Sequence, residues 1–242
     1  MKRIIDIIVS LFGLILFSPI IVPFIIIIFL QDFSSPFYIA KRVGKNEELF
    51  KMIKLRSMII NADKSGVDST SSNDMRITKV GKLIRKFKLD EITQLWNVLI
   101  GDMSLVGPRP NVKNETDIYT VEEKKLLKVK PGITDFASIV FSDEGEILSN
   151  SKNPDIDYNQ LIRPWKSRLG LLYVNNMNFI LDIKLILYTV LGIFSKKKAL
   201  NFLIKDLKKI KANNKIIEVS KRVNKLIPYP PPGSNKIIKR RC

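Results

Sequence analysis

The sequence contains no histidine, and its single cysteine, Cys242, is the last of the 242 residues. Without histidine, Ser-His-Asp and Cys-His catalytic groups, HExxH metalloenzymes and imidazole general bases are all excluded. A single cysteine excludes an intrachain disulfide and a thiolate metal cage. Any catalysis must therefore use carboxylates, amines or hydroxyls, and such hard oxygen ligands suit Mg²⁺ or Mn²⁺ better than zinc.

Acidic residues are also scarce, since 23 Asp and Glu stand against 41 Lys and Arg, for a formal net charge of +18. Such a charge attracts polyanions, and both nucleic acid and an anionic membrane surface are candidates. The basic residues form no recognised nucleic-acid-binding motif and lie among apolar segments. We therefore expect membrane lipids, and not nucleic acid, as partners, with a membrane-anchored nucleic-acid-binding protein as the alternative.

The longest uncharged run extends from Ile7 to Leu30. A straight helix over it would be about 36 Å long, enough to cross a hydrocarbon core of about 30 Å. Two features favour a re-entrant helix instead. Ser18-Pro19 interrupts the run, where proline removes a backbone hydrogen bond that the Ser18 hydroxyl could replace. Basic residues also flank the run on both sides, which favours the cytoplasmic side for both ends. From the residues alone, spanning and re-entrant helices both stay open.

The middle of the chain has the pattern of a small α+β domain. Residues 37–42 and 48–58 predict a β-hairpin with its turn at 43–46. The polar residues 61–74 predict a loop over or beside a site. Two sets of apolar residues with helical spacing follow and are expected to be core: Ile77, Val80, Leu83, Ile84 and Phe87, then Ile92, Leu95, Trp96 and Leu99.

The rear of the chain mixes apolar and basic residues. Residues 179–194 are apolar but include Asp182 and Lys184, which predicts an interfacial amphipathic helix. Residues 196–223 set leucines among lysines, which predicts a basic helix on an anionic surface. A solvated helix, or one packed on its own domain, is the alternative. Residues 224–242 are proline-rich and then basic, which predicts a disordered tail.

The residues best suited to catalysis lie in the segment 85–110, RKFKLDEITQLWNVLIGDMSLVGPRP. It places Asp90 and Glu91 side by side at a predicted helix start. One carboxylate could attack phosphorus while the other holds a divalent ion. A purely structural N-cap role for Asp90 is the alternative.

Basic residues around this pair are candidate phosphate ligands, namely Lys54, Arg56, Arg85 and Arg109. Arg109 is the strongest of them. The sequence Gly107-Pro108-Arg109-Pro110 restricts the backbone on both sides of this arginine, which is a costly way to present a merely solvated charge.

These segments resemble the bacterial sugar transferase family, the small monotopic phosphoglycosyl transferases. The resemblance covers about residues 2–195 and rests on KRIID with the following apolar run, KRVGKNEELFKMIKLRSM, RITKVGKLIRKFKLDEITQLWNVLIGDMSLVGPRP, VKPGIT and LLYVNNMNFILDIKLILYT. It implies a re-entrant helix with its kink at Ser18-Pro19. Asp135 and Phe136 depart from the family, much of which has glycine and tryptophan after PGIT, and this leaves the sugar open.

The resemblance also implies a two-step reaction. Asp90 would attack the β-phosphate of a UDP-sugar and release UMP, while Glu91 helps to hold Mg²⁺. Undecaprenyl phosphate would then take the phosphosugar from Asp90, which initiates surface glycan assembly. Lys54, Arg85 and Arg109 would occupy the basic positions of this active site. A catalytically silent scaffold for a glycan pathway is the remaining alternative, and the intact carboxylate pair disfavours it.

The organisation expected from these arguments has a re-entrant membrane helix at 1–32, a cytoplasmic catalytic domain at 33–178, interfacial amphipathic helices at 179–223 and a disordered basic tail at 224–242. The expected location is the bacterial inner membrane, with the catalytic domain facing the cytoplasm. A homodimer is compatible with this arrangement.

Overall fold

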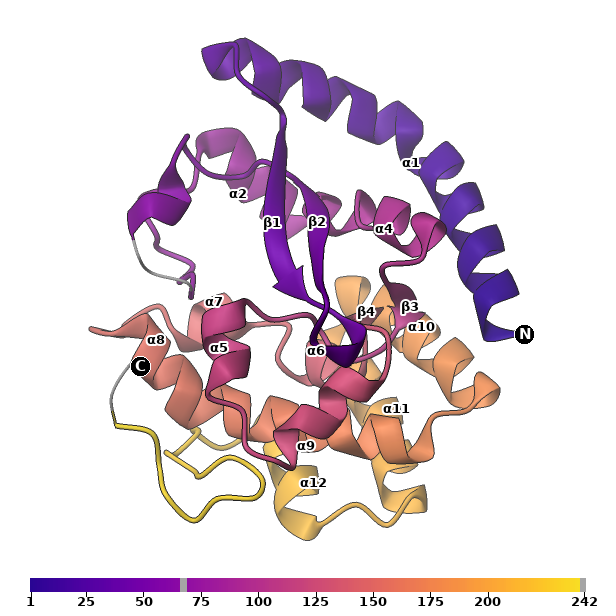
Figure 1. Cartoon of the computed structure of the whole chain (residues 1–242), viewed down its shortest axis with the longest axis vertical. Coiled ribbons are helices and arrows are strands. Elements are labelled where there is room, and N and C mark those ends of the chain that lie inside the picture. Colours follow the sequence, from indigo (N-terminus) through magenta and orange to yellow (C-terminus); the bar gives the residue numbers. More distant parts are fainter. Residues whose placement is uncertain (66–68, 240–242) are drawn as a thin grey trace.

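The computed structural model describes residues 1–65 and 69–239, and most of its regular structure is helical (Figure 1). The strands are β1 (Phe37–Val43), β2 (Leu49–Leu55), β3 (Ser104–Val106) and β4 (Gly132–Thr134). The α-helices are α1 (Lys2–Asp32), α2 (Lys79–Lys86), α3 (Leu89–Ile92), α4 (Leu95–Ile100), α5 (Lys113–Asp117), α6 (Phe136–Val140), α7 (Glu144–Ile147), α8 (Pro154–Asp157), α9 (Arg163–Asn176), α10 (Phe179–Phe194), α11 (Lys196–Lys209) and α12 (Asn214–Ser220). Short 3₁₀ segments lie at Lys45–Glu47, Ala62–Ser65 and Glu123–Lys128, and a π-helical turn lies at Tyr158–Ile162. The expected α+β, mainly helical fold is confirmed.

The predicted hairpin is present. Strands β1 and β2 pair in antiparallel register, with Phe37 opposite Leu55 and Val43 opposite Leu49. Within the predicted loop 61–74, residues 66–68 lie outside the described residues, and the loop's first part forms the Ala62–Ser65 turn.

A second, two-stranded sheet was not predicted. Strands β3 and β4 run parallel, with Ser104 opposite Gly132 and Val106 opposite Thr134. Their backbones come very close, because a Cβ on Gly132 would lie 2.1 Å from the nitrogen of Gly107. Strands of three residues carry too little alternation to be recognised in a sequence.

Helix α1 is one helix of 31 residues that changes direction along its length (Figure 1). Pro19 has no N–H to donate to the carbonyl of Ile15, and the Ser18 hydroxyl donates to that oxygen instead, at 2.8 Å. The hydroxyl thus replaces the hydrogen bond that proline removes. The helix is long and apolar enough to cross a membrane, and most of its apolar side chains are exposed.

Both ends of α1 are tied to the same body of the protein. At its start, Lys2 pairs with Asp182 of α10 at 2.7 Å. At its end, Asp32 pairs with Arg56, just after β2, at 2.6 Å. Ile28 packs between these ends in a small buried cluster with residues of β2, α2 and α3. The path of α1 is therefore fixed by the domain that it covers.

The prediction of core positions in α2 and α4 is partly wrong. Ile84 is fully buried as predicted, but Leu83, Phe87 and Trp96 are about half exposed, at 49%, 53% and 48%, and Val98, which was not among the predicted positions, is fully buried. Helix α4 lies beside α1 (Figure 1) and also contacts β2 and β3, whereas α2 packs on α3 and buries Ile84 in the small cluster that contains Ile28. Their outer faces add to the exposed apolar surface of α1. Apolar periodicity identifies the apolar face of a helix. It does not show whether that face packs in the protein core or forms part of an exposed apolar surface.

The main core lies on the other side of the hairpin, among α6, α9, α10, α11 and α12. Helix α10 has the bounds that the sequence predicted, and it buries Leu181 and Leu185 while Leu187 stays exposed. Helix α11 buries Leu203 and Leu207 in this core. The prediction that its apolar face lies on an anionic surface is therefore wrong, and the alternative, a helix packed on its own domain, is correct.

The predicted disorder of the tail is wrong for the described residues 224–239. Tyr229 stacks on Trp165 of α9 with ring centroids 4.5 Å apart. Arg168 donates to the Pro230 carbonyl at 2.9 Å, and Gln160 donates to the Ile238 carbonyl at 2.7 Å. The prolines stiffen an extended segment, and its carbonyls and aromatic ring supply the contacts that hold it down.

Candidate active site

Lys54 reaches the site from β2. Asn97 of α4 holds this strand, since its Nδ2 donates to the Lys51 carbonyl at 2.7 Å and its Oδ1 accepts from the Ile53 amide at 2.9 Å. Asn97 is fully buried, so it satisfies backbone groups that would otherwise lack partners. The amide thereby fixes Lys54 relative to α3 and α4.

Asp90 and Glu91 lie in the first turn of α3, a helix of only four residues. The N-cap of α3 is Lys88, whose backbone is left-handed with φ 53°, so the N-cap alternative for Asp90 is wrong. Leu89 is buried in the small cluster beneath α1. This anchor leaves the next two side chains at a cavity beside the helix.

Arg109 leaves the end of β3. The amide of Gly132 donates to the Pro108 carbonyl at 3.0 Å, which ties the arginine segment to the start of β4. Prolines at 108 and 110 fix φ on both sides of Arg109. The guanidinium is therefore presented from a rigid backbone.

The two carboxylates have different partners. Glu91 Oε1 pairs with Arg109 Nη2 at 2.9 Å. The nearest cationic atom to Asp90 is Lys54 Nζ, 3.9 Å from Oδ2, and within the described contacts the Asp90 carboxylate accepts no hydrogen bond. Arg85 approaches from α2 and donates from Nε to the Ser57 hydroxyl at 2.9 Å. Glu91 is thus engaged, whereas the lone pairs of Asp90 are available.

The surroundings of Asp90 and Glu91 also shift the pKa values of their carboxyl groups in opposite directions. Burial raises the pKa of Asp90 above its ordinary value, although the charge of Lys54 opposes the rise. Burial acts in the same direction on Glu91, but the charges of Arg109 and Lys88 outweigh it and lower the pKa of this carboxyl. Burial lowers the pKa of Lys54 to about 8, and the charge of Arg109 adds to this effect. The more basic carboxylate is the better nucleophile, and the permanently ionised one is better suited to holding cations.

A cavity of about 640 Å³, here called the main cavity, opens beside the pair. Much of its lining is basic: Arg42, Lys54, Lys82, Arg85, Lys86, Lys88, Arg109 and Lys166. Another part, here called the acidic wall, comes from α6, α7 and the turn between them and carries Ser138, Ser142, Asp143, Glu144 and Glu146. Residues 69–72 of the predicted loop also line this cavity. The cavity therefore combines a basic region that suits phosphates with a hydroxyl and carboxylate region.

A second cavity of about 370 Å³, here called the side cavity, shares Lys54, Arg85 and Asp90 with the main cavity. It extends from these residues to Ser34 and Ser35 after the end of α1. The carboxylate of Asp90 can therefore be approached along two routes.

Arg56 is the predicted phosphate ligand that the structure does not bring to the main cavity. It lines the side cavity, where its guanidinium pairs with Asp32 and donates to the Ile28 carbonyl at 3.3 Å. These contacts hold the end of α1. Lys54, Arg85 and Arg109, by contrast, all meet around Asp90 and Glu91.

Sequence reasoning missed Asn97 and the acidic wall. Asn97 is an amide in the middle of an apolar helical pattern, and that conflict with the pattern was the available signal. The acidic wall comes from short helices, and only the fold brings it to a cavity with residues nearly 50 positions earlier, such as Asp90.

An apolar helix beside a helical domain, with paired carboxylates among cations in a cavity, is an arrangement suited to phosphoryl transfer at a membrane. The family model for bacterial sugar transferases matches residues 1–196, and the chain belongs to this family. Residues 197–242 lie beyond the matched region.

Several curated relatives support the same assignment. The chain is 32% identical over 192 residues to the UDP-N-acetylgalactosamine-undecaprenyl-phosphate N-acetylgalactosaminephosphotransferase of Aeromonas hydrophila, covering 78% of this chain and 42% of the relative. It is 36% identical over 202 residues to the UDP-glucose:undecaprenyl-phosphate glucose-1-phosphate transferase of Klebsiella pneumoniae, covering 82% of this chain and 41% of the relative. It is 36% identical over 190 residues to the uncharacterized sugar transferase EpsL of Bacillus subtilis, covering 78% and 85%. The chain thus spans about two fifths of the first two relatives and most of the third.

Proposed function

We propose that this chain is a phosphoglycosyl transferase that moves a sugar 1-phosphate from a UDP-sugar to undecaprenyl phosphate and so initiates surface glycan assembly. The observation that carries the proposal is the partly buried Asp90 carboxylate, which lines the main cavity, accepts no hydrogen bond within the described contacts and is surrounded by Lys54, Arg85 and Arg109. A nucleic-acid-binding protein is disfavoured, because these cations gather around a carboxylate pair inside a cavity.

In the first step, an oxygen of Asp90 attacks the β-phosphorus of the donor. The bond from that phosphorus to the oxygen that bridges the two phosphates breaks, and UMP leaves with the electron pair. The sugar 1-phosphate stays on Asp90 as an acyl phosphate. Lys54, Arg85 and Arg109 stabilise the negative charge that develops on the diphosphate, which is the main contribution a protein makes to phosphoryl transfer.

In the second step, a phosphate oxygen of undecaprenyl phosphate attacks the same phosphorus and Asp90 leaves. The side cavity supports this order, because it reaches Asp90 from the end of α1, where a membrane-bound acceptor would arrive. The main cavity would hold the nucleotide, with the phosphates at its basic region and the sugar toward the acidic wall.

Glu91 fits a role in holding Mg²⁺. Its Oε1 is occupied by Arg109, and its other oxygen has no partner among the described contacts. The described residues contain no group of three or more carboxylate, histidine or cysteine side chains that could bind a metal. Mg²⁺ commonly binds one or two carboxylates together with substrate phosphates, and when bound it would neutralise charge on the diphosphate. We expect Glu91→Gln to raise the Mg²⁺ concentration needed for half-maximal rate about tenfold, since a charged ligand is lost. An unchanged Mg²⁺ dependence would remove Glu91 from this role.

We also propose that α1 is re-entrant and keeps both its ends on the cytoplasmic side of the bacterial inner membrane. The ties of Lys2 to Asp182 and of Asp32 to Arg56 support this, because one polar domain holds both ends of the helix. A cysteine inserted before Lys2 and another at Lys41, each in a Cys242→Ser background, test it. Both should resist an impermeant reagent applied from the periplasm, and labelling of one alone would contradict the re-entrant arrangement.

The sugar is not assigned. The Aeromonas and Klebsiella relatives are 32% and 36% identical to this chain, yet their names specify different sugars. A panel of UDP-sugars assayed for UMP release with Mg²⁺ and undecaprenyl phosphate would identify the donor.

The central experiment is an incubation with the donor and without the acceptor. We expect one phosphosugar mass on a peptide that contains Asp90. An adduct on another residue, or UMP release that strictly requires the acceptor, would refute the covalent mechanism.

A further inference from the structure

The C-terminal region beyond the family match reaches the active site. Arg222 follows α12, and its Nη2 lies 3.3 Å from Oδ2 of Asp143, a residue of the acidic wall. The same guanidinium lies over the ring of Phe141, with Cζ 5.4 Å from the centroid. Lys196, at the start of α11, pairs with the same oxygen of Asp143 at 2.6 Å. Cations from the start and the end of the α11–α12 region thus converge on one carboxylate of the cavity lining.

The backbone at Arg222 adds a separate observation. Its φ is 54°, in the left-handed region that costs a residue with a Cβ about 1 kcal/mol or more. The turn ends α12 at Ser220 and brings the arginine side chain to the acidic wall. Strained backbone of this kind persists where the surrounding contacts require it. At Arg222, the contacts that favour this backbone conformation are those of its side chain with Phe141 and Asp143.

The acidic wall is held on another side by the loop that precedes α2. The amide of Ser72 donates to the Gly145 carbonyl at 2.9 Å. Asp143 itself is mostly buried, and burial opposes its ionisation, but Lys196 and Arg222 outweigh this and lower its pKa. Helix α6 is anchored in the main core, whereas Asp143 lies in the turn between α6 and α7, and it is the point where Lys196 and Arg222 contact the acidic wall.

We propose that Arg222 is a positioning residue, which fixes the acidic wall through Asp143 and so sets the affinity of the main cavity for the sugar portion of its donor. This inference rests on the proposed function, and it adds a role for residues outside the family match. The phosphate-binding cations do not contact Arg222 in the described contacts, so binding of the nucleotide portion should not depend on it.

The test compares three variants with the parent chain. Arg222→Ala removes the contact, Arg222→Lys keeps the charge, and Lys221→Ala is the matched control, because Lys221 is exposed and its ammonium pairs, among the described residues, only with Glu218. Three quantities are measured for each: KM for the UDP-sugar, kcat, and the inhibition constant of UDP.

We expect Arg222→Ala to raise the KM for the UDP-sugar about tenfold, which corresponds to about 1.4 kcal/mol. We expect kcat and the UDP inhibition constant to change less than threefold, Arg222→Lys to recover most of the loss, and Lys221→Ala to match the parent. A merely structural role would instead weaken UDP and UDP-sugar alike. That result, or an unchanged KM in the folded Arg222→Ala variant, would overturn the proposal.

If Arg222→Ala does not fold, Asp143→Asn tests the proposal in its place, because this substitution is nearly isosteric and removes the same ion pair. It should raise KM to a similar extent, and an unchanged KM would equally contradict the proposal. Amide hydrogen exchange separates this inference from the proposed function. Peptides from 138–147 should exchange faster in Arg222→Ala than in Lys221→Ala even without any ligand, whereas absence of UMP release by the parent would refute only the transferase activity.

Discussion

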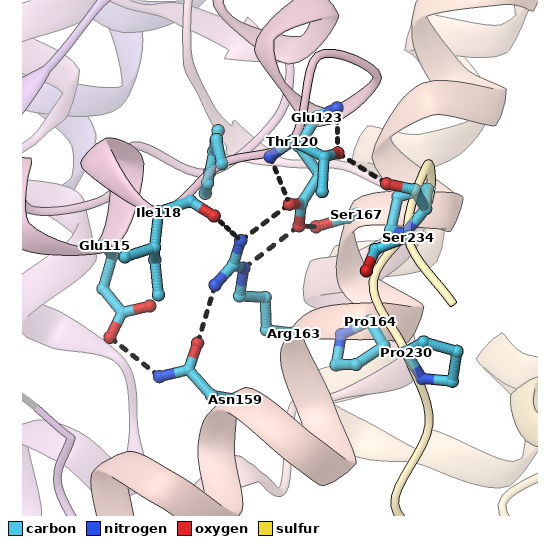
Figure 2. Close-up of polar contacts among 12 residues, drawn as sticks. Glu115, Ile118, Thr120, Glu123, Asn159, Arg163, Pro164, Ser167, Pro230 and Ser234 are labelled. Carbon is cyan, nitrogen blue, oxygen red and sulfur yellow. Dashed lines mark hydrogen bonds and ion pairs between the residues drawn. The ribbon is translucent and has the colours of Figure 1, made fainter. Parts of the chain in front are cut away.

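Two clusters of opposite charges in this protein, one buried and one partly exposed at a cavity, differ in how completely their polar atoms are hydrogen-bonded. In the first, Arg163 of α9 donates from Nε and Nη2 to Glu123, from Nη1 to Asn159 and from Nη2 to the Ile118 carbonyl, as Figure 2 shows. Glu123 also accepts from the Ser167 hydroxyl at 2.7 Å. Both charged side chains are at most 1% exposed. This cluster has no capacity left for a ligand.

The second cluster is the one around Asp90. Its cations line a cavity, the Asp90 carboxylate lies 3.9 Å from the ammonium of Lys54, and burial raises the pKa of that carboxyl. Both clusters withdraw charge from water, the second only in part, and only the first offsets the cost in solvation through several hydrogen bonds to each charged group. Incomplete hydrogen bonding of charged groups beside a cavity, and not burial of charge itself, therefore distinguishes the candidate site.

The largest expected effect that tests this comparison is on catalysis. Asp90→Asn should reduce UMP release by about 10⁴-fold or more, because an amide is a far poorer nucleophile than a carboxylate. Its melting temperature should stay close to that of the parent, since the described contacts give the carboxylate no hydrogen bond to lose. Substantial UMP release by the folded variant would show that another group is the nucleophile.

The next effect is on stability. Arg163→Met should lower the free energy of unfolding by about 3–5 kcal/mol, because it leaves Glu123 buried with an uncompensated charge. Denaturant unfolding in detergent measures this. Replacing both partners, as Arg163→Met with Glu123→Leu, should recover much of the loss, and molecules that remain folded should keep their rate of UMP release. If Arg163→Met alone were as stable as the parent, the hydrogen-bond network around Arg163 would not contribute to the stability of the fold.

Arg109→Ala should have a smaller effect and should act on catalysis. We expect a loss of about 2–4 kcal/mol of transition-state stabilisation, measured as kcat/KM for the sugar nucleotide. Arg109→Lys should restore only part of it, because an ammonium cannot reproduce the planar, bidentate contact of a guanidinium. Near-normal kcat/KM for Arg109→Ala at limiting donor would exclude a phosphate-binding role.

The smallest effect concerns pH. The contacts of Lys196 and Arg222 lower the pKa of Asp143, so the folded state favours its ionised form. This contribution is present above the ordinary aspartate pKa of about 3.9 and is lost as the pH falls through the lowered value. The parent should therefore be more stable than Asp143→Asn at pH 6 to 7, and the difference should shrink toward pH 3. A difference that does not change with pH would exclude the ionised carboxylate as its source.

Regions that depend on local patterns were predicted correctly. The hairpin of β1 and β2, the helix at Phe179–Phe194 and the replacement hydrogen bond of Ser18 all follow from alternation, helical spacing or proline chemistry within a few residues. The clustering of Asp90 and Glu91 with Arg109 was predicted in part from the same short segment, since Gly and Pro residues restrict the backbone there.

Regions whose structure depends on the segments that pack against them were not predicted correctly. The faces of α2 and α11 show similar mixtures of apolar and basic residues, yet Phe87 is exposed and Leu203 is fully buried. The residues 224–239 have a composition typical of disorder, but a stacked Tyr229 and backbone hydrogen bonds hold them on α9. Composition determines how much free energy a segment can gain by burying its apolar side chains. Whether the segment gains it depends on the surface that the rest of the protein offers.

Residue types and their order therefore establish which chemical groups are available: carboxylates and cations without histidine, an apolar N-terminal helix interrupted at Ser18-Pro19, and an adjacent pair of acids. The tertiary structure decided which of the cations meet those acids, sending Lys54, Arg85 and Arg109 to the main cavity and Arg56 to the end of α1. It also brought Arg222 to the acidic wall. The physical reason is that residue type fixes the charge and pKa range of a side chain, whereas its partners and its burial depend on contacts between segments far apart in the chain.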